Sequence, residues 1–170
     1  MACDITQGRA KECKDGIGGA TELFLFNFVE DPFTVAAGEA TAMNVAITAA
    51  YKYDLQGDGH ILDENVVSAR NEGTTLNTQT ITAILQKIDA STSAEMNLVA
   101  KSIPQAVVKD RNGNYFAVGI TDGIDFSIVA NTGSAKGDLN GYTLSGVSTE
   151  QDFAPILDSA TVTAFLAVVS

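Results

Sequence analysis

The chain has 170 residues, 45% of them hydrophobic, and carries 10 Lys and Arg against 21 Asp and Glu. This length predicts one domain, at roughly 100–200 residues per domain, and the hydrophobic content excludes wholesale disorder. The formal net charge of −11 argues against a DNA- or RNA-binding protein, because such binding needs Lys and Arg to neutralise the phosphates. A single His excludes chemistry that needs a His pair within one chain.

Neither a membrane span nor a secretory signal is expected. No stretch approaches the roughly 18 uncharged apolar residues that a membrane helix needs. The first residues, MACDIT, have neither a basic nor an apolar signal region. Cys3 and Cys13 are the only cysteines. Two free thiols are expected in a reducing cytoplasm, and a disulfide that closes the N-terminal segment stays open as an alternative.

The first third of the chain predicts an arm, a buried strand and a loop. Residues 1–21 are polar and contain several glycines, so we expect an N-terminal arm. Residues 22–28 (ELFLFNF) are apolar on both faces, which predicts a strand buried on both sides. Residues 29–42 contain Pro32 and Gly38 and are expected to form a loop.

A half-buried strand and a long loop are expected next. Residues 43–54 alternate between larger apolar side chains and small polar ones, the period of a strand with one buried face. Residues 54–74 are rich in turn-forming glycines, so a long loop is expected. Residues 75–88 hold many Thr and Ile and no Gly or Pro, which favours a strand.

One helix is expected, followed only by strands. Ser91 or Thr92 is suited to cap its N-terminus, and Pro104 ends it. The later strands are expected at 106–109, 115–119, 125–130, 142–149 and 161–169. The sequence DRNGN between the first two predicts a hairpin turn. The expected fold is therefore mainly β with one α-helix, an antiparallel β-sandwich or barrel of about eight strands with one flanking helix, over residues 22–170.

A calcium-binding loop is the one metal site that the sequence suggests. Residues 54–61 (DLQGDGHI) resemble the start of an EF-hand loop, with Asp54 at loop position 1 and Asp58 at position 5. The bidentate Glu expected at position 12 is replaced by Asn65, and Glu64 comes one residue early. The ordinary interpretation is a connecting turn, so we expect no metal, and Asp54, Asp58 and Glu64 are only a weak candidate set.

The sequence contains no motif of catalytic or cofactor-binding residues. Residues 15–20 (DGIGGA) are rich in glycine, but they precede a strand instead of opening a helix, unlike a dinucleotide loop. The chain has no Gly-x-Ser-x-Gly motif, and His60 lies in a polar loop without a pattern that supports a catalytic triad. We expect a protein without catalytic residues and without a cofactor.

Three segments resemble the tail tube proteins of tailed bacteriophages, and more closely small virion proteins of phages of Bacteroidetes-like hosts. The first is the arm, residues 2–6 (ACDIT) and 13–19 (CKDGIGG), leading into the first strand. The second is the helix with the hairpin at 107–116 (VVKDRNGNYF). The third is 137–144 (GDLNGYTL), followed by a polar strand and Ala154-Pro155.

The resemblance implies a tail tube subunit that polymerises into stacked, hexameric rings around an acidic channel for DNA. Further copies and other virion tail proteins would be its partners, DNA would pass without specific binding, and the protein would be made in the bacterial cytoplasm and act in the virion. The net charge agrees, because like charge suppresses adhesion of a polyanion. A head–tail connector, a terminator, a decoration protein, or a calcium- or carbohydrate-binding module remain alternatives.

Two sets of candidate residues follow from this interpretation. The residues expected to face a channel carry small polar side chains; they are Asn44, Thr48, Thr78, Thr80 and Thr82. The residues expected to contact neighbouring subunits come from the arm and the long loop; they are Cys3, Asp4, Ile5, Gln56, Asp58, His60, Val66 and Val67.

Overall fold

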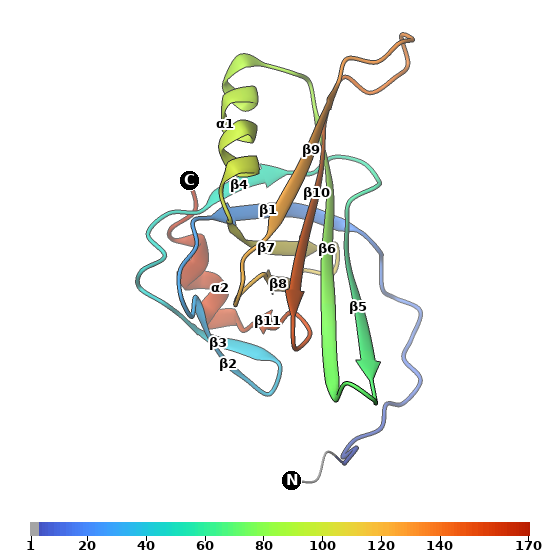
Figure 1. Ribbon diagram of the computed structural model, residues 1–170, viewed down its shortest axis with the longest axis vertical. Coiled ribbons are helices and arrows are strands. Elements are labelled where there is room, and N and C mark those ends of the chain that lie inside the picture. The colour runs from blue at the N-terminus through green and yellow to red at the C-terminus, as the bar shows by residue number, and fades with distance from the viewer. Residues whose placement is uncertain (1–3) are drawn as a thin grey trace.

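The computed structural model describes residues 4–170, which form two β-sheets and two α-helices (Figure 1). In chain order the elements are β1 (Ala20–Phe26), β2 (Phe33–Ala36), β3 (Glu39–Met43), β4 (Tyr51–Asp54), β5 (Ile61–Ala69), β6 (Thr74–Gln86), α1 (Ala90–Lys101), β7 (Gln105–Asp110), β8 (Tyr115–Val118), β9 (Asp125–Asn131), β10 (Gly141–Glu150), β11 (Ile156–Leu157) and α2 (Ser159–Leu166). The expected mainly-β fold with a flanking helix is confirmed, with more strands and one more helix than expected.

Two separate sheets account for all the strands of the described residues. The larger has seven strands in the order β2-β3-β11-β8-β7-β1-β4, and the smaller has four in the order β5-β6-β10-β9. Neighbouring strands are antiparallel except for the short parallel pair of β11 with β3. Among residues 4–170 both sheets end in strands that pair on one side only, so neither sheet closes into a barrel.

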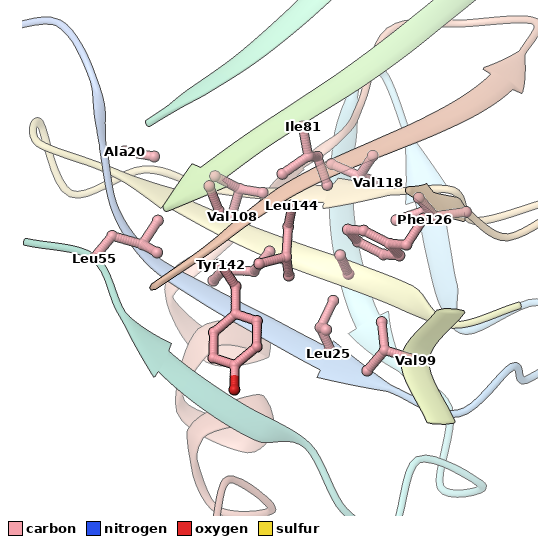
Figure 2. Packing of buried hydrophobic residues seen from close by; sticks show 14 of the residues in the cluster. Ala20, Leu25, Leu55, Ile81, Val99, Val108, Val118, Phe126, Tyr142 and Leu144 are labelled. Atoms are coloured by element: carbon pink, nitrogen blue, oxygen red, sulfur yellow. The ribbon is translucent and has the colours of Figure 1, made fainter. Parts of the chain in front are cut away.

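The main core lies between the two sheets. Leu25 of β1 and Val108 of β7 face the four-stranded sheet, which contributes Ile81 and Leu144 to the same cluster (Figure 2). Helix α1 adds Met96 and Val99 to this cluster. Burial of these apolar side chains between the sheets is the dominant favourable contribution to folding.

A second core lies on the opposite face of the seven-stranded sheet. Phe24 of β1 points away from the first core, because successive strand residues face opposite sides. It meets Phe165 of α2 edge to face, with ring centroids 5.6 Å apart. The expectation that the strand at 22–28 is buried on both sides is thus confirmed, although the strand begins at Ala20 and ends at Phe26.

Residues 161–169 were expected to form a strand, and this prediction is wrong because most of them lie in or just after α2 (Ser159–Leu166). Asp158 caps the helix, with its carboxylate accepting a hydrogen bond from the Thr161 N–H at 2.7 Å. Thr161 and Phe165 are buried, at the i, i+4 spacing of a helix face. Packing against the sheet therefore overrides the β-branched composition of the segment.

The two expected loops contain strands, and the expected strand at 43–54 is interrupted. Residues 29–42 hold β2 and β3, and residues 54–74 hold β5, which pairs along its length with β6. Strand β3 ends at Met43 because Asn44 makes a turn, with its Oδ1 accepting a hydrogen bond from the Ala46 N–H at 2.9 Å.

Helix α1 begins two or three residues earlier than expected. Its N-cap is Asp89, whose carboxylate accepts a hydrogen bond from the Thr92 N–H at 2.7 Å and from the Ser91 hydroxyl at 2.6 Å. Ser91 and Thr92, which were expected as caps, therefore lie inside the helix and bind the true cap. Before β1, residues 4–19 form an exposed segment outside any strand or helix, the blue segment of Figure 1.

Candidate functional site

The outer face of the four-stranded sheet carries the stripe of threonines expected from the sequence. In β6, Thr78, Thr80 and Thr82 alternate with residues buried between the sheets, such as Gln79 and Ile81. Because side chains alternate across a strand, the three threonines lie on the side of the sheet away from the core. The structure therefore brings these three expected channel-facing residues together on one face.

The neighbouring strands extend this polar face across the whole sheet. Thr80 pairs with Asp63 of β5 on one side and with Val147 of β10 on the other, and Val147 pairs with Asp125 of β9. The next row joins Thr82 to Ile61, Ser145 and Ser127. The face is thus built from small hydroxyl side chains and exposed aliphatic ones, with an acidic residue on each outer strand.

The four strands contain no basic residue. Their charged side chains are all acidic and are Asp63, Glu64, Asp125 and Glu150. The connections between these strands do contain basic residues, such as Arg70 between β5 and β6 and Lys136 between β9 and β10. Glu64 and Glu150 are used in contacts inside the protein, so the charge on the outer face comes from Asp63 and Asp125 and is negative.

Both edges of this sheet lack a strand partner among residues 4–170. Strand β5 has nine residues and β9 has seven, and each pairs with one neighbour only. An unpaired edge presents a row of backbone N–H and C=O groups that is suited to pair with another chain. The exposed Val67 and Val129, on β5 and β9 respectively, add apolar surface near these edges.

A buried polar network fastens the sheet to the rest of the molecule. Gln79 donates a hydrogen bond to Glu64 Oε1 at 3.1 Å and accepts one from the Gly119 N–H at 3.1 Å. The same Glu64 oxygen accepts hydrogen bonds from Asn77 Nδ2 at 3.0 Å and from the Ala154 N–H at 2.7 Å. This network was not predicted from the sequence, although the polar residues Asn77 and Gln79, which alternate with the threonines of β6, are a signal of it.

The connection between β9 and β10 is ordered by one carboxylate. Asp138 Oδ2 accepts hydrogen bonds from the N–H groups of Ala135 at 2.8 Å and Ser134 at 2.9 Å, and from the Ser134 hydroxyl at 3.0 Å. These bonds stabilise the ionised form and hold the pKa of Asp138 below its usual value. The loop therefore has a defined shape at one end of the sheet, where Figure 1 shows it projecting beyond the strands.

The other expected channel-facing residues lie elsewhere. Asn44 and Thr48 are in the connection between β3 and β4, which belongs to the seven-stranded sheet. Asn44 Nδ2 donates to the backbone oxygens of Glu30 at 3.3 Å and Asp31 at 3.2 Å, so this side chain is used within its own turn. These two residues are therefore separate from the threonine face.

The expected subunit-contact residues fall into exposed and buried groups. Asp4, Ile5, Gln56, Asp58, Val66 and Val67 are exposed. His60 is buried: its Nδ1 accepts a hydrogen bond from the Ile84 N–H at 3.2 Å, and its Nε2 lies 3.0 Å from the Gln56 carbonyl oxygen. It is thus not available to a neighbouring subunit, because its ring joins the β4–β5 connection to β6. Cys3 lies outside the described residues.

The EF-hand-like residues are not brought together. Asp54 forms an ion pair with Lys52 at 2.9 Å, Asp58 forms one with Arg111 at 3.0 Å, and Glu64 belongs to the buried network. Among residues 4–170 no three His, Cys, Asp or Glu side chains are grouped so that they could hold a metal ion.

Neither helix within the described part of the chain is long and apolar enough to cross a membrane. Comparison with protein-family models, with curated proteins and with solved structures finds no match to this chain.

Proposed function

We propose that the protein is a structural subunit of a phage tail tube, which assembles into stacked rings around a channel lined by the four-stranded sheet. Further copies of the chain and other tail proteins of the virion are its partners, and DNA passes through the channel without specific binding. The observation that carries the proposal is the four-stranded sheet itself, which has two unpaired edges and an outer face without a basic side chain.

The strand directions permit closure of a ring by edge-to-edge pairing. Each neighbouring pair in the order β5-β6-β10-β9 is antiparallel, so β5 and β9 run in opposite directions. Strand β9 of one copy placed beside β5 of the next would therefore be antiparallel, like every other pair in the sheet. Closing a sheet on itself removes the exposed edges that make an isolated sheet prone to aggregation.

The chemistry of the outer face suits a conduit for a polyanion. Hydroxyl side chains interact with water, and the acidic residues Asp63 and Asp125 repel phosphates without binding them. Repetition around a ring would multiply the negative potential, because each copy adds the same acidic row. The formal net charge of −11 points in the same direction.

Cross-linking of the two edges tests the proposal directly. Cys3 and Cys13 are first replaced by serine, and Asn65→Cys on β5 is then combined with Ser127→Cys on β9 in one chain. Because the register between β9 of one copy and β5 of the next is not known, cysteines at neighbouring positions of the two strands are tried as well. Purified protein at high concentration is oxidised and analysed by denaturing electrophoresis, and the same samples are viewed by negative-stain electron microscopy. We expect a ladder of covalent oligomers together with rings or tubes.

The matched controls are the two single-cysteine variants, which carry one thiol per chain and cannot form a ladder beyond a dimer. Rings seen by microscopy with no edge-to-edge cross-link at any register would assign the assembly to another surface. A chain that stays monomeric at high concentration, with no cross-links, would refute the proposal.

A further inference from the structure

The middle of the N-terminal arm is attached to the body of the protein by the amide side chain of Asn112. Asn112, at the tip of the β7–β8 hairpin, accepts a hydrogen bond from the Ile17 N–H at 3.0 Å through its Oδ1. Its Nδ2 donates a hydrogen bond to the Ile17 carbonyl oxygen at 2.9 Å. The amide therefore pairs with the arm as a neighbouring strand would, using one donor and one acceptor.

This contact is the outermost attachment of the arm among the described residues. The next one inward is the hydrogen bond from the Arg111 N–H to the Gly19 carbonyl oxygen, at 3.1 Å. Further out, Arg9 and Glu12 form an ion pair within the arm itself, at 3.8 Å. Loss of the Asn112 contact would thus free the arm as far as Gly19.

Asn112 is followed by Gly113, and both residues are exposed. Asparagine is among the chemically labile residues, and a following glycine has no side chain to hinder attack by its backbone nitrogen on the Asn amide carbon. The chain contains a second Asn-Gly pair, Asn140-Gly141, but Gly141 is buried in β10 and paired with strands on both sides. Only the first pair combines the reactive sequence with an exposed turn.

We propose that Asn112 is a deamidation site and that its reaction releases the N-terminal arm. The Gly113 nitrogen forms a bond to Asn112 Cγ, the Cγ–Nδ2 bond breaks, and the amide leaves as ammonia, taking up the proton of the Gly113 N–H. Water then opens the five-membered imide at either carbonyl. The products are an aspartate, or an isoaspartate in which the main chain continues through the side-chain carbonyl.

Either product is incompatible with the present contacts. The Nδ2 group lies between two acceptors, the Ile17 carbonyl oxygen at 2.9 Å and Asp110 Oδ2 at 3.3 Å. A carboxylate formed at position 112 has no donor at neutral pH and would face both acceptors, one of them an anion. In the isoaspartate the extra main-chain carbon also lengthens the tight turn, in which Gly113 has a positive φ of 88°.

The arm in turn protects Asn112. Oδ1 and Nδ2 are both bound to Ile17, and the Gly113 N–H donates to the Asp110 carbonyl oxygen at 3.3 Å. Because the reaction needs the side chain free to meet the Gly113 nitrogen, we expect the arm to detach first. Ile17→Pro removes the N–H that donates to Asn112 and leaves Asn112-Gly113 intact. Because Ile17 is exposed, this change leaves both cores untouched.

The first test measures the reaction in the intact protein. Wild-type protein is incubated at mildly alkaline pH, and deamidation is followed at each Asn by peptide mapping with mass spectrometry. We expect Asn112 to react before Asn140, and Ile17→Pro to accelerate Asn112 alone. Equal rates at Asn112 and Asn140, or no acceleration in Ile17→Pro, would overturn the proposal.

The second test measures release of the arm, by amide hydrogen exchange at Ile17. We expect exchange roughly tenfold faster in Asn112→Asp. The donor to the Ile17 carbonyl oxygen is lost, and the new carboxylate is repelled by that oxygen and by Asp110, which separates the Ile17 N–H from its acceptor. Asn114→Asp is the matched control, because it places the same charge beside the same Asp110 carboxylate without touching the arm. Equal acceleration in both variants would assign the effect to a disrupted turn and refute a direct attachment by Asn112.

Discussion

The side-chain oxygen of Gln79, on β6, accepts a hydrogen bond from the backbone N–H of Gly119, just after β8, at 3.1 Å. This bond crosses the interior and joins the four-stranded sheet to the seven-stranded one. Gln79 is almost fully buried, at 2% exposure, so both of its polar atoms need partners within the protein. The sheet that carries the candidate surface is therefore oriented by polar contacts as well as by the apolar core.

We predict that Gln79→Ala lowers the free energy of unfolding by about 2–4 kcal/mol, because the Gly119 N–H loses its acceptor in the interior. Thr80→Ala, one residue away on the outer face, should change it by no more than about 0.5 kcal/mol. Chemical denaturation of both variants provides the comparison. Similar losses in the two would show that the polar network does not hold the sheets together.

Two adjacent residues of helix α2, one buried and one exposed, allow a second comparison of stability. Phe165 is fully buried against the aromatic rings of Phe24 and Phe26, whereas Leu166 beside it is 42% exposed. We expect Phe165→Ala to cost about 3–5 kcal/mol, through lost burial and the cavity left behind. Leu166→Ala should cost about 1 kcal/mol or less in the same denaturation measurement. Equal effects would mean that α2 does not complete the second core.

The N-cap of α1 makes stability depend on pH. Hydrogen bonds from the Ser91 hydroxyl, and from the Thr92 N–H and hydroxyl, lower the pKa of Asp89 from 3.8 to about 2. Because the folded pKa is the lower one, the ionised cap stabilises the fold above pH 3.8 and loses this effect as pH falls toward 2. Asp89→Ala should therefore lower Tm at neutral pH, and its difference from wild type should shrink over that range.

Asp89→Asn is the control for this pH dependence, because its amide oxygen still caps the helix but does not titrate. Its Tm should lie between those of wild type and Asp89→Ala at neutral pH. A difference between wild type and Asp89→Ala that stayed constant down to pH near 2 would contradict an ionised cap.

A last prediction concerns the proposed channel. Thr82→Lys places a positive charge on the outer face, in a row with Ile61, Ser145 and Ser127, none of which is acidic. Assembled tubes of this variant should retain added DNA that wild-type tubes release, and rising salt should abolish the binding through counterion release. The measurement is co-sedimentation of labelled DNA with the tubes.

Ala164→Lys provides the matched charge on α2, far along the chain and on the other side of the seven-stranded sheet. It should leave DNA retention unchanged if the four-stranded sheet lines the channel. Retention by Ala164→Lys tubes, with none by Thr82→Lys tubes, would place the channel on the opposite side of the subunit.

Local patterns in the sequence determined several elements of this protein. Apolar residues on both faces predicted β1, β-branched residues predicted β6, and the DRNGN turn predicted the β7–β8 hairpin. The start of α1 was predicted within three residues, and the threonines of β6 were assigned to a common face. These features depend on contacts between residues close in the chain, so a short stretch of sequence is enough to specify them.

Tertiary structure alone decided the rest. A short apolar run such as 161–169 suits a strand or a buried helix, and the aromatic pocket around Phe165 selects the helix. Strand β5 has a weak pattern of its own and forms because β6 supplies its hydrogen-bond partners. The burial of His60, the network around Gln79 and the pairing of Ile17 with Asn112 join residues distant in the chain. Such contacts depend on how the sheets are ordered and packed, which no local pattern encodes.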